Sequence, residues 1–184
     1  MALRSILLDG EPGLLKTSRP IKDFDKRLHQ LLDDMRETLI NAGGAGLAAP
    51  QVGILRRAVL VLETNVEEDQ IEQIIELINP ELIYEDGEQE GVEGCLSFPG
   101  EVGIVKRPMN VKVRAQDRYG EFFEVSGTAM TARAYCHEID HLNGIIYKSR
   151  ATHMLSEEEI EEMYKPDDSI SEDSSEDEVK GENS

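Results

Sequence analysis

The chain has 184 residues, which is enough for one domain or for one domain with an extension. Its 38 acidic side chains outnumber the 19 basic ones and give a formal net charge of −19, so direct nucleic-acid binding is not expected. The two cysteines are too few for a disulfide scaffold, and no apolar run is long enough for a secretory signal or a membrane span. We therefore expect a cytoplasmic protein without a membrane segment.

The negative charge is concentrated at the C-terminal end of the chain. Residues 156–184 contain 13 acidic side chains against Lys165 and Lys180. Residues 156–159 (SEEE) form a capping-box pattern that predicts a helix of at most two turns, and the sequence after Pro166 has almost no apolar content. The sequence thus predicts a folded domain over residues 1–155 and an acidic, largely disordered tail over residues 156–184.

The first regular element is an amphipathic helix that starts near Lys22. Its apolar stripe consists of Phe24, Leu28, Leu31, Leu32, Met35 and Leu39. Asp23 is the expected N-cap, and the glycines at 43 and 44 are expected to end the helix.

Several short strands are expected between this helix and a second one. Residues 44–53 are small residues around one amide and predict a tight connection or a place of close backbone approach. Residues 57–62 predict a strand, residues 65–70 an acidic turn, and the apolar residues up to Ile83 a strand region that Pro80 divides into at least two short elements. Residues 85–90 predict a polar loop, and residues 111–125 a hairpin.

The second helix is expected over residues 129–141, with Ser126 or Thr128 as its cap, and residues 145–146 are expected to form a last short strand. The predicted fold class is α+β. Short, mostly antiparallel strands would pack around this second, central helix, and the amphipathic helix would lie N-terminal to them.

The second helix carries residues 137–141 (HEIDH), a spacing that suits a metal ion. At about 100° per residue, His137 and His141 lie about 40° apart on one helical face, so two imidazole nitrogens can reach one ion. Glu138 is placed to contact a water on that ion without binding the ion. Two histidines do not complete a catalytic site, which usually has three protein ligands, and chance on an ordinary amphipathic helix is the alternative reading.

Two other short segments accompany the histidine pair. Residues 44–51 (GAGLAAPQ) and 93–97 (EGCLS) precede it, and the three segments in this order resemble the three motifs of the peptide deformylase family. The resemblance covers about residues 1–150. A zinc peptidase is disfavoured, because Tyr147 stands where a metzincin has a third histidine and the downstream glutamates lie in the acidic tail. A non-catalytic relative is disfavoured because Gln51, Cys95 and Glu138 are all present.

The resemblance implies that Cys95 is the third ligand beside His137 and His141. Family members of this kind use Fe(II), and Zn(II), Ni(II) or Co(II) can substitute. The implied reaction is hydrolysis of the N-formyl group of N-formylmethionyl nascent peptides, with release of formate. Cys136 points about 100° away from His137 on the helix and should not bind the same ion.

The resemblance also implies roles for the surrounding residues. Glu138 would be the general base and acid, and Gln51 and the backbone N–H of Leu96 would hold the oxyanion. Ala45, Gly46 and Gly94 would contact the substrate. The expected methionine pocket contains Ala45, Val92, Met130 and Ala134.

Asp140 is expected to fix the helix through an ion pair. Some relatives dock on the ribosome through a basic C-terminal helix, whereas this chain ends in acidic residues. Any ribosome contact is therefore expected to be transient, and docking through the C-terminus is in doubt.

Overall fold

The protein is described by a computed structural model that covers residues 2–63 and 73–163. It has the predicted α+β architecture, with helices and two antiparallel sheets. In chain order the main elements are α1 (Lys26–Ala42), β1 (Gly46–Ala48), β2 (Ala58–Leu62), β3 (Ile74–Asp86), β4 (Gln89–Cys95), β5 (Phe98–Arg107), β6 (Asn110–Gln116), β7 (Phe122–Thr128), α2 (Ala129–Leu142), β8 (Ala151–Met154) and α3 (Glu157–Met163). Single 3₁₀ turns span Pro12–Leu15, Ala49–Val52 and Tyr147–Ser149.

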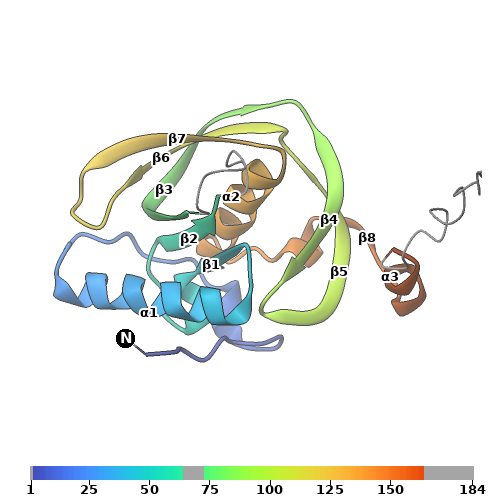
Figure 1. Cartoon of the computed structure of the whole chain (residues 1–184), viewed down its shortest axis with the longest axis horizontal. Coiled ribbons are helices and arrows are strands. Elements are labelled where there is room, and N and C mark those ends of the chain that lie inside the picture. The colour runs from blue at the N-terminus through green and yellow to red at the C-terminus, as the bar shows by residue number, and fades with distance from the viewer. Residues whose placement is uncertain (1, 64–72, 164–184) are drawn as a thin grey trace, which may run out of the picture.

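The larger sheet has the strand order β1-β2-β3-β6-β7, and the smaller sheet has the order β4-β5-β8. Neighbouring strands in both sheets pair antiparallel. Helix α2 lies in the interior, with the larger sheet on one side and the β4–β5 hairpin on the other (Figure 1). Because α2 is covered from both sides, eleven of its fourteen residues are buried. Polar side chains on this helix therefore need partners within the protein.

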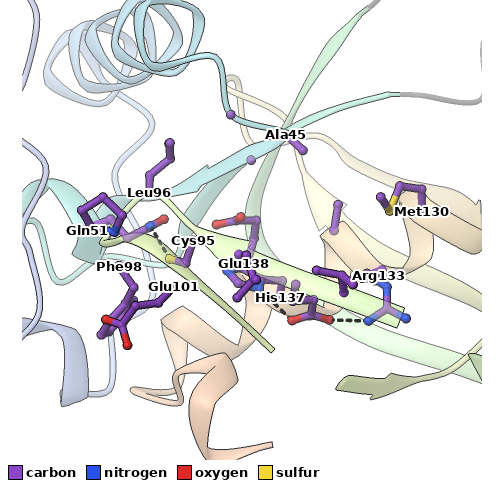
Figure 2. A pocket seen from close by; sticks show the side chains of 18 of the residues that line it. Ala45, Gln51, Cys95, Leu96, Phe98, Glu101, Met130, Arg133, His137 and Glu138 are labelled. Atoms are coloured by element: carbon purple, nitrogen blue, oxygen red, sulfur yellow. Dashed lines mark hydrogen bonds and ion pairs between the residues drawn. The ribbon is translucent and has the colours of Figure 1, made fainter. Parts of the chain in front are cut away.

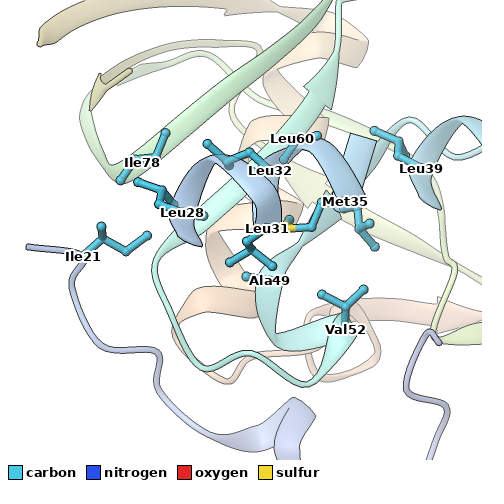
Figure 3. Close-up of a cluster of buried hydrophobic side chains, with 12 residues drawn as sticks. Ile21, Leu28, Leu31, Leu32, Met35, Leu39, Ala49, Val52, Leu60 and Ile78 are labelled. Carbon is cyan, nitrogen blue, oxygen red and sulfur yellow. The ribbon is translucent and has the colours of Figure 1, made fainter. Parts of the chain in front are cut away.

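Helix α1 packs its apolar stripe against β2 and the segment that follows β1. The core there includes Leu28, Leu32 and Met35 from the helix and Leu60 from β2 (Figure 3). The predicted N-cap was wrong by two residues. Asp25 caps the helix, and its carboxylate accepts hydrogen bonds from the backbone N–H groups of the next turn. The predicted end is confirmed, since Gly43 adopts a left-handed conformation with a φ of 67°.

The strand predictions need three corrections. Pro80 does not divide its region, because β3 continues through it with an irregular register between Ile78 and Glu81. The predicted loop over 85–90 is reduced to a short turn between β3 and β4. Residues 145–146 are not a strand, and the last strand is instead β8, which pairs with β5. The backbone N–H of Ile145 donates to Asp140 O at the end of α2, so it is not available to pair with a strand.

Helix α3 begins at Glu157 as predicted. Ser156 and Glu159 form the expected capping box, with Glu159 N donating to Ser156 Oγ at 3.3 Å and Ser156 N donating to Glu159 Oε2 at 2.8 Å. The predicted acidic turn at 65–70 and the predicted disordered stretch after Pro166 lie outside the described residues. None of the described helices has the length and apolar character needed to cross a membrane.

Asn79 fastens the segment before α1 to the larger sheet. It sits at the irregular point of β3 with a φ of 51°. Its side chain accepts a hydrogen bond from Ile21 N at 2.8 Å and donates to Ile21 O at 2.9 Å and to Gln116 Oε1 at 2.8 Å. One amide thus ties together the chain before α1, β3 and β6. Asparagine also tolerates the left-handed region better than other residues with a Cβ.

Asn79→Ala should lower the free energy of unfolding by about 2–4 kcal/mol, because three hydrogen bonds are lost and alanine is strained at positive φ. Asn79→Gly loses the same hydrogen bonds without the strain and should be destabilised less. Urea unfolding of the three proteins measures the order. Equal stability of wild type and Asn79→Ala would contradict this role.

Candidate metal centre and active site

Helix α2 places His137 and His141 one turn apart on the same buried face. Their ring centroids are 5.0 Å apart, and the His141 side chain is almost wholly enclosed. The helix spans the predicted residues and ends at Leu142, with Asn143 as its C-cap and Gly144 following at a φ of 71°. The geometry expected from the four-residue spacing is therefore present.

Cys95 joins the two histidines from the smaller sheet. It is the last residue of β4, and its Sγ lies 3.3 Å from His141 Nε2. Single ligand atoms of Cys95, His137 and His141 all lie within 4.8 Å of one another. Within residues 2–63 and 73–163 this is the only such group of His, Cys, Asp and Glu side chains. Cys136 does not belong to it.

Glu93, two residues before Cys95 on β4, holds the ring of His137. Its Oε2 lies 2.9 Å from His137 Nδ1, which leaves the opposite ring nitrogen for the ligand cluster. Arg107 donates to both Glu93 oxygens, from Nε at 2.8 Å and from Nη2 at 3.0 Å. Burial opposes ionisation, but the hydrogen bonds from Arg107 and His137 outweigh it and lower the Glu93 pKa to about 2. Glu93 is therefore an ionised acceptor for His137.

Asp140 anchors the same helix through two arginines, as expected from the sequence. Arg107 Nη1 donates to Asp140 Oδ2 at 2.6 Å. Arg150, after the helix, donates to both oxygens at 2.6 and 2.7 Å. Arg107 thus bridges Asp140 on α2 and Glu93 on β4, which fixes the helix relative to the strand that carries Cys95.

Glu138 is buried beside this cluster with little polar support. Its Oε2 has no hydrogen-bond partner among the described residues, and burial raises the pKa of its carboxyl group to about 7 despite the opposing effect of His137. Gly46 on β1 leaves it the necessary space. A Cβ at Gly46 would lie 2.5 Å from Glu138 Oε1 and 2.7 Å from its Cγ. Among the described residues, packing against Gly46 and not a hydrogen bond to Oε2 holds the carboxyl group in place.

Gln51 points its side-chain amide toward the cysteine. Its Oε1 accepts a hydrogen bond from Ala48 N at 2.8 Å, which fixes the orientation of the amide. Its Nε2 lies 3.3 Å from Cys95 Sγ and 3.2 Å from Ser97 Oγ. A donor group is therefore oriented toward the mouth of the cluster.

The donor set fits a divalent cation. Burial lowers the His141 pKa to about 3, so its imidazole is in the neutral form that binds metals. Burial would also lower the His137 pKa, yet hydrogen bonds to Cys95 and Glu93 raise it to about 10. Cys95 and Glu93 thus favour a positive charge at the position of His137. One thiolate and two imidazoles are ligands that suit Zn(II), Fe(II) and similar ions.

The cluster opens into a pocket of about 370 Å³ between β1, the β4–β5 hairpin and α2 (Figure 2). The pocket brings together all the site residues predicted from the sequence except His141, which is not among its lining residues. The predicted residues in its lining are Ala45, Gly46, Gln51, Val92, Gly94, Cys95, Leu96, Met130, Ala134, His137 and Glu138.

The sequence interpretation missed three charged residues around the site. Glu93 lies inside one of the motifs and Arg107 lies within the stretch that resembles the family, but neither has a predicted role. Arg133 lies outside the three motifs. Arg133 was detectable in principle, because it precedes His137 by four residues and so shares its helical face. Nothing in the sequence indicated that Glu93 and Arg107 meet, because that contact depends on the register of β4 and β5.

Comparison with known proteins assigns the family. Residues 3–157 match the sequence model described as polypeptide deformylase. A peptide deformylase from Alkaliphilus metalliredigens is 53% identical over 150 residues, covering 82% of this chain and 97% of that protein. The crystal structure of peptide deformylase from Thermotoga maritima is 35% identical, with a TM-score of 0.77 over 83% of this chain and 99% of that one. A Met-Ala-Ser-bound class I type b peptide deformylase from Acinetobacter baumannii is 34% identical, with a TM-score of 0.75 over 82% and 100%. The chain therefore belongs to the polypeptide deformylase family and is a hydrolase that removes the N-formyl group from newly made proteins.

Proposed function

We propose that Cys95, His137 and His141 hold the divalent ion of this deformylase, and that the native ion is Fe(II), with Zn(II), Ni(II) or Co(II) as substitutes. The observation that carries the proposal is the convergence of one sulfur and two imidazole nitrogens within 4.8 Å. When bound, such an ion supplies Lewis-acid polarisation of the formyl group and acidifies a water. Glu93 keeps His137 in the orientation that this requires.

Glu138 is the proposed proton carrier of the reaction. Its pKa of about 7 suits a group that first accepts a proton and then returns it. In this role a Glu138 carboxylate oxygen takes a proton from the attacking water and then protonates the leaving amine of the peptide. Its lack of a hydrogen-bond partner among the described residues leaves Oε2 free for this exchange.

The oxyanion is proposed to be stabilised by Gln51 and by the backbone N–H of Leu96. Gln51 Nε2 is held near Cys95 by the hydrogen bond from Ala48 N to its other end, so the donor needs little reorganisation. Leu96 follows Cys95 directly and lines the same pocket. Both donors would thus lie on the side of the pocket nearest the cysteine.

The substrate is proposed to bind along Ala45, Gly46 and Gly94, with the first side chain in the pocket lined by Val92, Met130 and Ala134. Strand β1 is an edge strand of the larger sheet, so its outer side is available to an extended peptide. The related Acinetobacter baumannii enzyme binds Met-Ala-Ser, a peptide that begins with methionine. N-formylmethionyl nascent peptides are the matching substrate for this chain.

We further propose that residues 1–155 form the catalytic domain and that the acidic segment 156–184 is not needed for hydrolysis. A cytoplasmic enzyme acting on nascent chains meets the ribosome, and the formal charge of −19 favours a transient encounter over stable contact with RNA. We expect this enzyme to bind neither a membrane nor nucleic acid directly.

Glu138→Gln should retain the metal and lose about 10²–10⁴-fold in kcat, because the glutamate carries protons and is not a ligand. Formate release from a short formyl-Met peptide measures the rate, and metal per chain is determined on the same sample. A metal-free variant, or one with near-normal turnover, would refute the proposed role.

Cys95→Ala should remove the bound ion together with the activity, whereas Cys136→Ala should keep both. The two variants delete the same thiol group, but only Cys95 lies within the ligand cluster. Metal analysis of protein purified without air compares them directly. Equal retention of metal in both variants would show that Cys95 is not a ligand.

Gly46→Ala should lower kcat while leaving folding and metal content intact, since the added Cβ displaces the side chain of Glu138. The backbone of β1 accepts alanine, so no strain in the main chain is expected. In a Glu138→Asp background, whose side chain is shorter, the same substitution should be tolerated roughly tenfold better. Strictly multiplicative rate losses in the double variant would contradict the steric explanation.

A further inference from the structure

Arg133 is a charged residue in the wall of the substrate pocket. It lies on α2 one turn before His137, and only 5% of its surface is exposed. Figure 2 shows Arg133 near Met130 at the edge of the pocket, with its guanidinium joined to a carboxylate. Arg133 supports the Glu93 carboxylate that holds His137, but that contact uses only Nη1 of its guanidinium.

Among the described residues, Arg133 forms its hydrogen bonds through Nη1 alone. Nη1 donates to Glu93 Oε1 at 2.9 Å, to Val105 O at 2.9 Å and to Gly91 O at 3.3 Å. Nε and Nη2 have no hydrogen-bond partner among the described residues. Neither is among the fully buried side-chain atoms that lack a partner, so both remain accessible to water or to a ligand.

The guanidinium is also fixed in place. A Cβ at Gly91 would lie 3.1 Å from Arg133 Nη2, so the group packs against the backbone of β4. The bonds to two carbonyl oxygens and to Glu93 restrain its rotation. A donor that is already ordered loses little conformational freedom when it binds a ligand.

Apart from its partner Glu93, Arg133 shares the pocket lining with several apolar side chains. Val92, Met130 and Ala134 form this part of the pocket, which suits an unbranched side chain. Arg133 therefore supplies N–H donors next to these apolar side chains. The sulfur of methionine is a weak hydrogen-bond acceptor and is polarisable, whereas the corresponding methylene of norleucine accepts nothing.

We propose that Arg133 is a specificity-determining residue whose free N–H donors bind the sulfur atom of the substrate's methionine side chain. The inference rests on the proposed placement of that side chain among Val92, Met130 and Ala134. Arg133 thus lets the enzyme distinguish methionine from an all-carbon side chain of nearly the same shape. An oxygen in the place of the sulfur lone pair, as in methionine sulfoxide, is a stronger acceptor for the same donors.

The test uses two formylated tripeptides that differ only in methionine or norleucine at the first position and compete in one reaction. The ratio of their kcat/KM values does not depend on how much of the enzyme is active or metal-loaded. Wild type should prefer methionine by about two- to fivefold, the size of a weak hydrogen bond. Arg133→Met retains an unbranched apolar stem without donors and should bring the ratio to about 1.

Arg107→Lys is the matched control, since Arg107 bonds the same Glu93 carboxylate but does not line the pocket. It can lower the rate through His137, but it should leave the methionine to norleucine ratio as in wild type. If Arg133→Met gives no active protein, Arg133→Lys replaces it in the same competition experiment. Its single ammonium group is drawn to Glu93, so this ratio should also fall toward 1.

The kcat/KM for a formyl-methionine-sulfoxide peptide is a second measure of hydrogen bonding by the same Arg133 donors. Arg133→Met should lose more kcat/KM for the sulfoxide than for methionine. An unchanged methionine to norleucine ratio in an active Arg133 variant would overturn the inference.

A further variant, Ala134→Leu, fills the pocket and distinguishes failure of the Arg133 inference from failure of the proposed pocket. If Ala134→Leu lowers kcat/KM for formyl-methionine, the pocket assignment stands, and if it does not, that assignment falls as well.

Discussion

The buried carboxylate of Glu93 is the contact on which the site depends. It accepts hydrogen bonds from His137, Arg107 and Arg133, which come from α2 and from the partner strand β5. An ionised carboxylate at this depth is stable only because these donors surround it. Removal of one donor leaves part of the buried negative charge without a partner. Glu93 thus orients a proposed metal ligand and helps to hold α2 against the β4–β5 hairpin.

The fold supplies these contacts because α2 is enclosed by two sheets. If α2 were covered on one side only, Asp140 and His141 would be exposed to water. Here the larger sheet covers one side, and the β4–β5 hairpin brings Cys95 and Glu93 to the other. Arg107 joins Asp140 to Glu93 across the gap, so the helix cannot shift along the hairpin without breaking a buried ion pair. Rigid support of this kind suits a reaction that needs a fixed arrangement of reacting groups.

Much of this was predictable from local patterns. The apolar stripe of α1, the histidine pair on α2 and the hairpin of β6 and β7 follow from periodicity and turn residues, and the three motifs together indicated the family. Contacts that depend on register were not predictable. Pro80 looked like a strand end because a proline lacks a donor, yet it lies at an irregular pairing where no donor is needed. Gly46 looked like a place for a substrate backbone, yet its lack of a side chain also makes room for Glu138.

The proposed site requires that one sulfur and two imidazole nitrogens of this chain bind a single ion. X-ray absorption spectroscopy of the full-length protein loaded with one equivalent of Zn(II) tests it most directly. We expect one sulfur neighbour at about 2.3 Å and two imidazole nitrogens at about 2.0–2.1 Å. A first shell without sulfur, or a sulfur neighbour that persists after Cys95→Ala, would contradict it.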